Sequence, residues 1–147
     1  MQALRQIASS RIFQATLVSW TAAQVVKLLL YAIRFHKIDF RRLVGSGGMP
    51  SSHSAFITCL AVSIGREAGW SSPVFLLSLG LAFVIMADAA GVRRAAGQQA
   101  QALNRILGDL YRFDPVQPKH LKELLGHTPL QVVVGALWGV LFAVYYP

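Results

Sequence analysis

The chain has 147 residues, of which 54% are hydrophobic and 14% are charged, and its mean hydropathy is positive, which is typical of a membrane protein. A single cysteine, Cys59, excludes an internal disulfide framework and a cysteine-based zinc site. The net charge of +8 accompanies long apolar runs, which favours anionic lipid over nucleic acid as the partner.

Four apolar stretches predict membrane helices at residues 16–35, 54–64, 73–90 and 130–146. Arg5 and Arg11 precede the first stretch as in a signal peptide, but no clear cleavage motif follows, so we expect a retained membrane segment. Arg66 and Glu67 close the second stretch after about a dozen residues, which favours a buried or re-entrant helix. Packing against the other helices is the alternative that would carry it across.

The long polar region at residues 91–128 contains an amphipathic pattern that predicts a helix on the membrane surface. Apolar residues recur there at i, i+3, i+4 and i+7 among polar ones: Leu103, Ile106, Leu107 and Leu110 against Gln98, Gln101, Arg105 and Asp109. Phe113, Asp114, Pro115 and Pro118 end the pattern. We therefore expect an all-α fold, a small integral membrane bundle of about four membrane helices and one amphipathic interfacial helix. It should form a single domain over residues 1–147.

If all four stretches cross the membrane, the polar residues that could carry chemistry collect on one face. Of the 14 Lys and Arg residues, eleven then lie on this face and three, Arg5, Arg11 and Arg66, on the other. Setting aside four cations that chemistry could require leaves seven against three. The positive-inside rule places the polar face in the cytoplasm.

The residues Pro50-Ser51-Ser52-His53 follow Gly45-Ser46-Gly47-Gly48 and open the second apolar stretch. Glycines let backbone N–H groups approach a ligand, and the helix N-terminus presents unpaired donors and a partial positive charge to an anion. Histidine can move a proton near neutral pH. The pattern predicts a phosphate site, and its alternative is an ordinary loop with a serine N-cap.

Several cations are placed to bind the same phosphate. Lys27 lies inside the first stretch, where a cation is costly, and Arg34 follows two helical turns later on the same face. The alternatives are that Lys27 snorkels and Arg34 ends the helix. Arg93 and Arg94 follow the third stretch, either as a fork for phosphate oxygens or as a stop signal at lipid headgroups.

His127 precedes the fourth stretch, where it is either a second catalytic histidine, an interfacial residue or a cap. Two histidines, several cations and a glycine-serine turn at one membrane face are sufficient for phosphoryl transfer without a metal. Carboxylates are few, and no histidine pair has the spacing of a zinc or magnesium site. The sequence thus predicts no metal and no cofactor.

These motifs resemble the type 2 phosphatidic acid phosphatase superfamily, which includes vanadium haloperoxidases, and in particular its short divergent membrane branch. Lys27 to Arg34 is similar to the family's Lys-x6-Arg-Pro, with Phe35 in place of proline. Residues 50–53 are similar to Pro-Ser-Gly-His, with Ser52 in place of glycine. The third motif is split, its arginine being Arg93 or Arg94 and its histidine His127. The similarity to the divergent branch covers nearly the whole chain.

The resemblance implies that His127 is a nucleophile that forms a phosphohistidine and that His53 protonates the departing alcohol. Phosphate would be bound by cations and by amides at the start of the second helix: Lys27, Arg34, Arg93 or Arg94, Ser51 and Ser52. The family aspartate that orients the nucleophile corresponds to Gln131, which accepts a hydrogen bond but supplies no charge. Glu123 or Asp88 is the candidate carboxylate to replace it.

The predicted function is a metal-independent phosphatase of a membrane lipid phosphate, either phosphatidic acid, phosphatidylglycerophosphate or a prenyl phosphate. A polyprenyl diphosphate pyrophosphatase is a close variant. The alternative is a catalytically weak or inactive membrane protein that binds anionic phospholipid or a membrane partner, favoured by Gln131, Phe35 and the split motif. Because little of the chain lies outside the membrane, a homo-oligomer would help to close the site from water.

Overall fold

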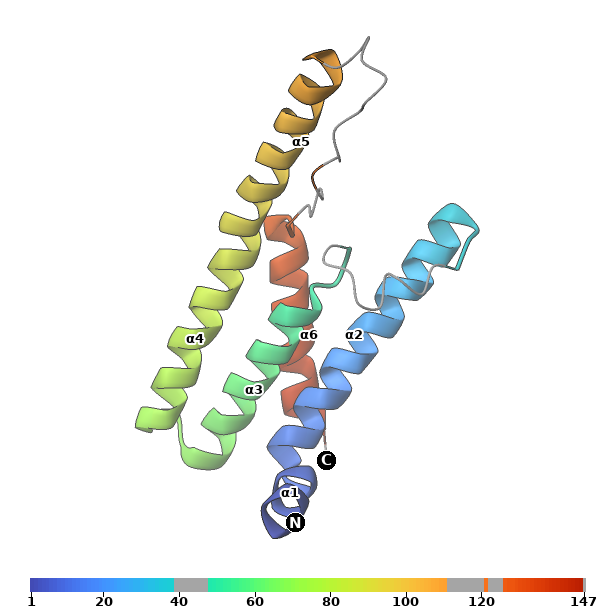
Figure 1. The fold of residues 1–147 in the computed structure, drawn as a ribbon. Coiled ribbons are helices and arrows are strands. Elements are labelled where there is room, and N and C mark those ends of the chain that lie inside the picture. Colours follow the sequence, from blue (N-terminus) through green and yellow to red (C-terminus); the bar gives the residue numbers. More distant parts are fainter. Residues whose placement is uncertain (39–47, 111–120, 122–125, 147) are drawn as a thin grey trace.

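The computed structural model describes residues 1–38, 48–110, 121 and 126–146, and they form a helical bundle (Figure 1). The predicted all-α fold is confirmed. The helices, in chain order, are α1 (Gln2–Ser9), α2 (Arg11–Phe35), α3 (Ser52–Ala68), α4 (Pro73–Ala90), α5 (Val92–Leu110) and α6 (Pro129–Tyr145).

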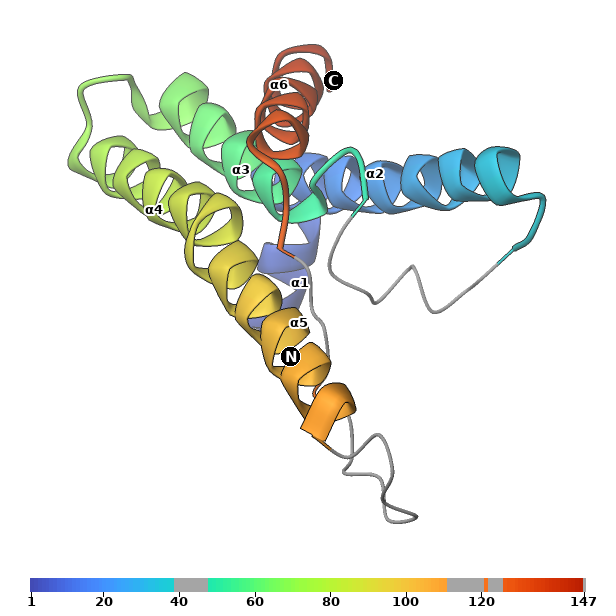
Figure 2. The same cartoon turned by 90° about the horizontal axis from the view of Figure 1, so that it is seen from above.

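Helix length and composition in the described part of the chain fit a membrane bundle. Two segments are long and apolar enough to cross a bilayer, α2 and the run Pro73–Leu110 that joins α4 and α5. The helix α6 is apolar over 17 residues, and at 1.5 Å per residue it is about 25 Å long. Figure 2 shows α5 continuing in nearly the direction of α4. The amphipathic helix predicted within residues 91–128 is α5, Val92–Leu110, and its place on the membrane surface stays a prediction.

The centre of the bundle is α3, which packs against α2, α4 and α6 (Figure 1). The helix is longer than the apolar stretch at residues 54–64, because it begins at Ser52, includes Arg66 and Glu67, and ends at Ala68, followed by Gly69 with a φ of +93°. The guanidinium of Arg66 donates to the carbonyl oxygens of Ala143 and Val144 at the end of α6. Its charge is therefore satisfied by carbonyl groups that a helix C-terminus leaves unpaired, and the helix continues through it.

Small residues bring α3 and α6 into backbone contact. A Cβ atom on Gly135 would lie 2.4 Å from the carbonyl oxygen of Ser51, and one on Gly139 would lie 2.4 Å from that of Ala55. Glycines four residues apart are the pattern that allows two membrane helices to approach closely. A further link joins α6 to α2, since Trp138 Nε1 donates to the Ser19 carbonyl oxygen at 3.2 Å. Together these contacts fix the position of α6 along the axes of α3 and α2.

Replacing Gly139 by alanine is expected to destabilise the bundle by about 1–3 kcal/mol, because the new methyl group would meet the backbone of α3, which cannot move aside. Gly80→Ala is the matched control, since a Cβ atom at Gly80 in α4 has no neighbour within 4 Å. Thermal unfolding in detergent measures both variants. An unchanged midpoint for Gly139→Ala would contradict this packing.

The first helix was not predicted. Ser10 separates α1 from α2, and its hydroxyl oxygen accepts the Phe13 N–H, so α2 begins at Arg11 instead of residue 16. The segment ahead of the first apolar stretch carries Arg5 between polar and apolar side chains, and none of α1 is buried. Such a helix fits the plane of a membrane surface.

Candidate active site

Two histidines from distant parts of the sequence face each other at one end of the bundle. His53 is the second residue of α3, and His127 lies two residues before α6. Their ring centroids are 6.4 Å apart and the ring planes are inclined by 59°. The Ser51 N–H donates to the Gln131 carbonyl oxygen at 3.1 Å, which joins the starts of the two helices. The structure therefore brings together the histidines of the second and third motifs.

The imidazole of His127 is buried, with 3% of the residue exposed. Its Nδ1 lies 3.3 Å from Gln131 Oε1. A carboxamide oxygen only accepts hydrogen bonds, so in this contact Nδ1 carries the proton and Nε2 carries the lone pair. Among the described residues Nε2 has no hydrogen-bond partner. A buried polar atom without a partner needs an explanation, and a nitrogen lone pair that is not engaged in a hydrogen bond is available to act as a nucleophile.

Gln131 is itself held in place by a capping box at the start of α6. Its Oε1 also accepts the Thr128 N–H at 3.1 Å, and its own N–H donates to Thr128 Oγ1 at 3.4 Å. Since both ends of the residue are tied to Thr128, the side chain has little freedom beside His127. This contact holds the His127 imidazole in one tautomer and one orientation. The resemblance implies the same task for residue 131, where the family has an aspartate.

Burial is the main cause that lowers the pKa of His127 below its ordinary value of 6.5. The hydrogen bond that His127 donates to Gln131 acts in the opposite direction and raises the pKa. The charges of Lys27 and Arg93 and the neighbouring His53 lower it further. His127 is therefore neutral at pH 7, the form in which imidazole is a nucleophile.

Lys27 is buried in the middle of α2, with 4% exposed. Its Nζ donates to Gln24 Oε1 at 2.8 Å and to Ser52 Oγ at 3.5 Å, so the ammonium reaches the first turn of α3. Gly48 lies over its aliphatic chain, because a Cβ atom there would be 2.9 Å from Lys27 Cγ. Its φ of +87° also favours glycine. The last residue of the glycine-serine turn thus covers the lysine, which is held between helices and does not extend to the surface.

The first turn of α3 supplies the backbone part of the candidate anion site. Ser51 and Ser52 are 0% and 1% exposed. Ser51 is the N-cap, and its Oγ accepts two hydrogen bonds from Ser54, one from the N–H at 3.4 Å and one from the Ser54 hydroxyl at 3.0 Å. The remaining donors of this turn and the positive end of the helix dipole lie beside the Lys27 ammonium.

The carboxylate of Asp88 accepts a hydrogen bond from Arg93 Nε at 2.6 Å, which is the ion pair found among the described residues. Asp88 therefore pairs with Arg93, and the contact on His127 Nδ1 comes from Gln131. Arg94, the residue after Arg93, is half-buried. Glu123 and residues 45–47 of the glycine-serine turn lie outside the described residues.

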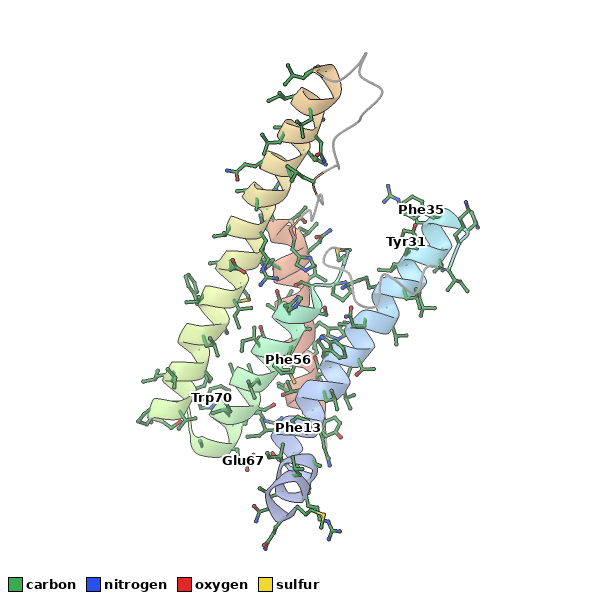
Figure 3. All side chains as sticks on the ribbon, viewed as in Figure 1. Phe13, Tyr31, Phe35, Phe56, Glu67 and Trp70 are labelled. Carbon is green, nitrogen blue, oxygen red and sulfur yellow. The ribbon has the colours of Figure 1, made fainter. Side chains whose placement is uncertain are left out.

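Arg34 is not brought to the histidines. It is exposed, and its guanidinium carbon lies 5.7 Å from the centroid of the Phe35 ring. Figure 3 shows Tyr31 and Phe35 at the end of α2, away from α3 and α6. Although Lys27 and Arg34 share a helix face, Arg34 lies about 10 Å further along the axis. Lys27 therefore lies beside the first turn of α3, whereas Arg34 lies near Phe35 at the end of α2.

Gln24 was not predicted as a site residue. Gln24 is 7% exposed and holds the Lys27 ammonium from one turn earlier on the same face. A second polar residue three positions before a lysine in an apolar helix was the available signal.

In the described part of the chain, no three His, Cys, Asp or Glu residues are grouped so that they could hold a metal ion.

A cavity of about 680 Å³ lies at the opposite end of the bundle, where α1 and α2 meet the ends of α3 and α6. Its lining includes Arg11, Arg66 and Glu67 and none of the residues around the histidines. The candidate chemistry therefore belongs to the histidine end and not to this cavity.

The comparisons with known proteins agree with the motifs. A family model described as the Divergent PAP2 family matches residues 8–142. The uncharacterized membrane protein YuiD of Bacillus subtilis is 41% identical over 130 residues, which cover 81% of this chain and 82% of that protein. No solved structure matches the chain.

Proposed function

The chain belongs to the Divergent PAP2 family, and from this membership and the histidine pair we propose that it is a phosphatase of a membrane lipid phosphate. The observation that carries the proposal is the buried Nε2 of His127, which has no partner in the described structure and lies on a ring facing His53. The ring centroids are 6.4 Å apart, so both imidazoles could contact the same phosphoryl group.

In the first step the Nε2 lone pair of His127 attacks phosphorus, and the bond from phosphorus to the ester oxygen breaks. His53 donates a proton to that oxygen, so the lipid leaves as a neutral alcohol. The phosphoryl group remains on Nε2, and the imidazole ring gains positive charge. Gln131 Oε1 accepts the Nδ1 hydrogen bond throughout, which keeps the ring in position.

In the second step His53 takes a proton from a water molecule, whose oxygen attacks the phosphorus of the phosphohistidine. The bond between phosphorus and Nε2 breaks, inorganic phosphate leaves, and the Nε2 lone pair is restored. His53 is exposed and His127 is buried. This difference suits a proton carrier that exchanges with water and a nucleophile that does not.

Lys27 and the first turn of α3 would bind the phosphate oxygens and stabilise their charge in the transition state. The Arg93 guanidinium, already paired with Asp88, would contribute through its remaining donors. This end of the bundle faces the cytoplasm in our proposal, because the excess of Lys and Arg lies there. Phosphatidic acid, phosphatidylglycerophosphate and prenyl phosphate all place a phosphate monoester at this depth.

The experiment is phosphate release from these lipids by the detergent-purified protein, with EDTA present throughout. We expect release from at least one lipid monoester, and equal rates with and without EDTA. Strict dependence on an added divalent cation would contradict the proposed mechanism, and no release from any lipid would contradict the activity.

A second candidate is a lipid-binding protein without turnover, and two observations favour it. The carboxylate of Asp88 is paired with Arg93, and Gln131 supplies no charge to His127. Such a protein would bind a lipid phosphate equally well as wild type and as His127→Ala, and neither form would release phosphate. Binding and release measured on the same two preparations separate the candidates.

Replacing Gln131 by glutamate tests the orienting contact through pH. Glutamate has the same shape and keeps the capping box, but its charge beside Nδ1 raises the pKa of His127. Loss of the His53 proton lowers kcat/KM on the alkaline side. Since burial lowers the pKa of His127 in the wild type, the decline on the acid side should begin only below about pH 6.5. In Gln131→Glu we expect this decline to begin about one pH unit higher, with kcat raised by about 10-fold above it.

The control for this variant is Gln131→Ala, which loses both the cap and the contact with His127 and should lower kcat at every pH. An unchanged pH profile in Gln131→Glu would show that Gln131 does not act on the titrating group.

A further inference from the structure

An asparagine in α5 holds the chain that leads to His127. Asn104 is 8% exposed, while its neighbours Leu103 and Arg105 are exposed. Its Nδ2 donates to the Leu121 carbonyl oxygen at 2.9 Å, and its Oδ1 accepts the Leu121 N–H at 2.8 Å. The carboxamide therefore satisfies both backbone groups of one residue that lies six positions before His127.

This contact holds the backbone of Leu121 and not its side chain, which is 44% exposed. Burial of the leucine therefore contributes little to fixing this point. The two hydrogen bonds to its part-buried backbone therefore hold Leu121 in place. Only a side chain with one donor and one acceptor at the carboxamide spacing can make both.

Two further contacts attach the same part of the chain to α4 and α5. A Cβ atom on Gly126 would lie 2.4 Å from the Arg94 backbone nitrogen, so the chain touches the backbone of this helix. The His127 N–H donates to the Ala89 carbonyl oxygen at 3.1 Å. Leu121 contacts Asn104, Gly126 contacts Arg94 and His127 contacts Ala89, so this part of the chain runs antiparallel to α5 and the end of α4. The run Pro73–Leu110 thus holds the nucleophile segment at three places.

We propose that Asn104 is a positioning residue for His127, an inference that rests on the proposed phosphatase function. The Leu121 clamp, the Gly126 contact and the His127–Ala89 bond place the backbone that carries His127, while Gln131 Oε1 orients its imidazole. A displacement of about 1 Å at a reacting group can cost about 100-fold in rate. Asn104 touches no substrate in this account and acts only through the chain that carries His127.

Asn104→Ala is the first test, measured by lipid phosphate hydrolysis. We expect kcat to fall about 10- to 100-fold with KM changed less than about threefold, because the cations that bind phosphate are untouched. Gln98→Ala is the matched control, an exposed polar residue of the same helix, and should keep wild-type kinetics. A loss confined to KM, or an equal loss in Gln98→Ala, would overturn the positioning role.

A second readout does not depend on turnover. Diethyl pyrocarbonate modifies accessible imidazole nitrogens, and peptide mapping separates His127, which is buried, from His53, which is exposed. In Asn104→Ala we expect faster modification of His127 with the rate at His53 unchanged. If the wild type proves inactive, the proposed function fails while this measurement still tests the clamp. Unchanged modification of His127 would overturn it.

Asn104→Asp covers the case in which the alanine variant does not fold. Aspartate still accepts the Leu121 N–H but cannot donate to the Leu121 carbonyl oxygen, so one bond of the pair is lost. We expect an intermediate fall in kcat and an intermediate rate of His127 modification. Wild-type values for both in a folded Asn104→Asp would overturn the inference.

Discussion

Replacing His127 by alanine is expected to lower phosphate release by about 10³-fold or more, because removal of a nucleophile leaves only binding and electrostatic effects. The variant should still fold, since the backbone N–H that bonds to the Ala89 carbonyl oxygen is retained. Its affinity for a lipid phosphate should be near that of the wild type. The measurement is the initial rate of phosphate release beside lipid binding on the same preparation.

The histidine control is His36→Asn. His36 is exposed at the end of α2 with a φ of +52°, a conformation that asparagine adopts readily. Full activity in this variant, with loss in His127→Ala, would assign the effect to the site. A His127→Ala protein that retains more than about a tenth of wild-type activity would exclude His127 as the nucleophile.

His53→Ala should show a different dependence on the substrate. Without the acid, a lipid alcohol leaves poorly, so release from a lipid monoester should fall by about 10²–10⁴-fold. A nitrophenyl phosphate needs no protonation of its leaving group, and its first step should be much less affected. Equal losses for both substrates would contradict the role of His53 in protonating the leaving group.

Replacing Lys27 by methionine is expected to weaken phosphate binding by about 10- to 100-fold, because the variant loses one hydrogen bond between charged groups. Methionine fills a similar space and leaves no buried charge, so the fold should not be weakened. The loss should appear in KM and in the inhibition constant of inorganic phosphate. Isothermal titration with phosphate measures the second quantity directly.

Arg34→Met is the matched control for Lys27→Met, because it removes a cation from the same helix face at an exposed position near Phe35. Its effect on phosphate binding should be small. If Arg34→Met weakened binding as much as Lys27→Met, the separation of the two residues along α2 would be contradicted.

Hydrophobic stretches predicted most of the helices, because burial and membrane insertion both follow composition. The length of α3 was mispredicted, since Arg66 and Glu67 look like an end unless its carbonyl partners on α6 are known. The start of α2 was mispredicted for a local reason, a serine N-cap inside a polar segment. The errors arise where charges and polar groups find partners that the sequence does not reveal.

The same distinction applies to the site. Motif resemblance identified His53, His127 and Gln131, and the structure brings them together. The resemblance left Asp88 and Glu123 as candidate carboxylates beside His127, and it did not reveal that Asp88 pairs with Arg93, five residues later in the chain. The Asn104 clamp was not predictable either, since a single asparagine among polar neighbours on an amphipathic helix is ordinarily solvated.

The arrangement assigns separate tasks to separate helices. Contacts at Gly135 and Gly139 set α6 against α3 and so bring the two histidine-bearing ends to one level. The ammonium of Lys27 enters from α2, and the segment before His127 is held by α4 and α5. Because each group comes from a different element, changes in helix packing should alter activity even far from the histidines.

The central claim is that His127 carries the phosphoryl group, and trapping that intermediate tests it most directly. The protein is mixed with substrate, quenched in alkali, where a phosphohistidine persists, and mapped by mass spectrometry. We expect one phosphoryl group on His127 in the wild type, a larger fraction in His53→Ala with a nitrophenyl substrate, and none in His127→Ala. Turnover without label on His127, or label that survives His127→Ala, would contradict the mechanism.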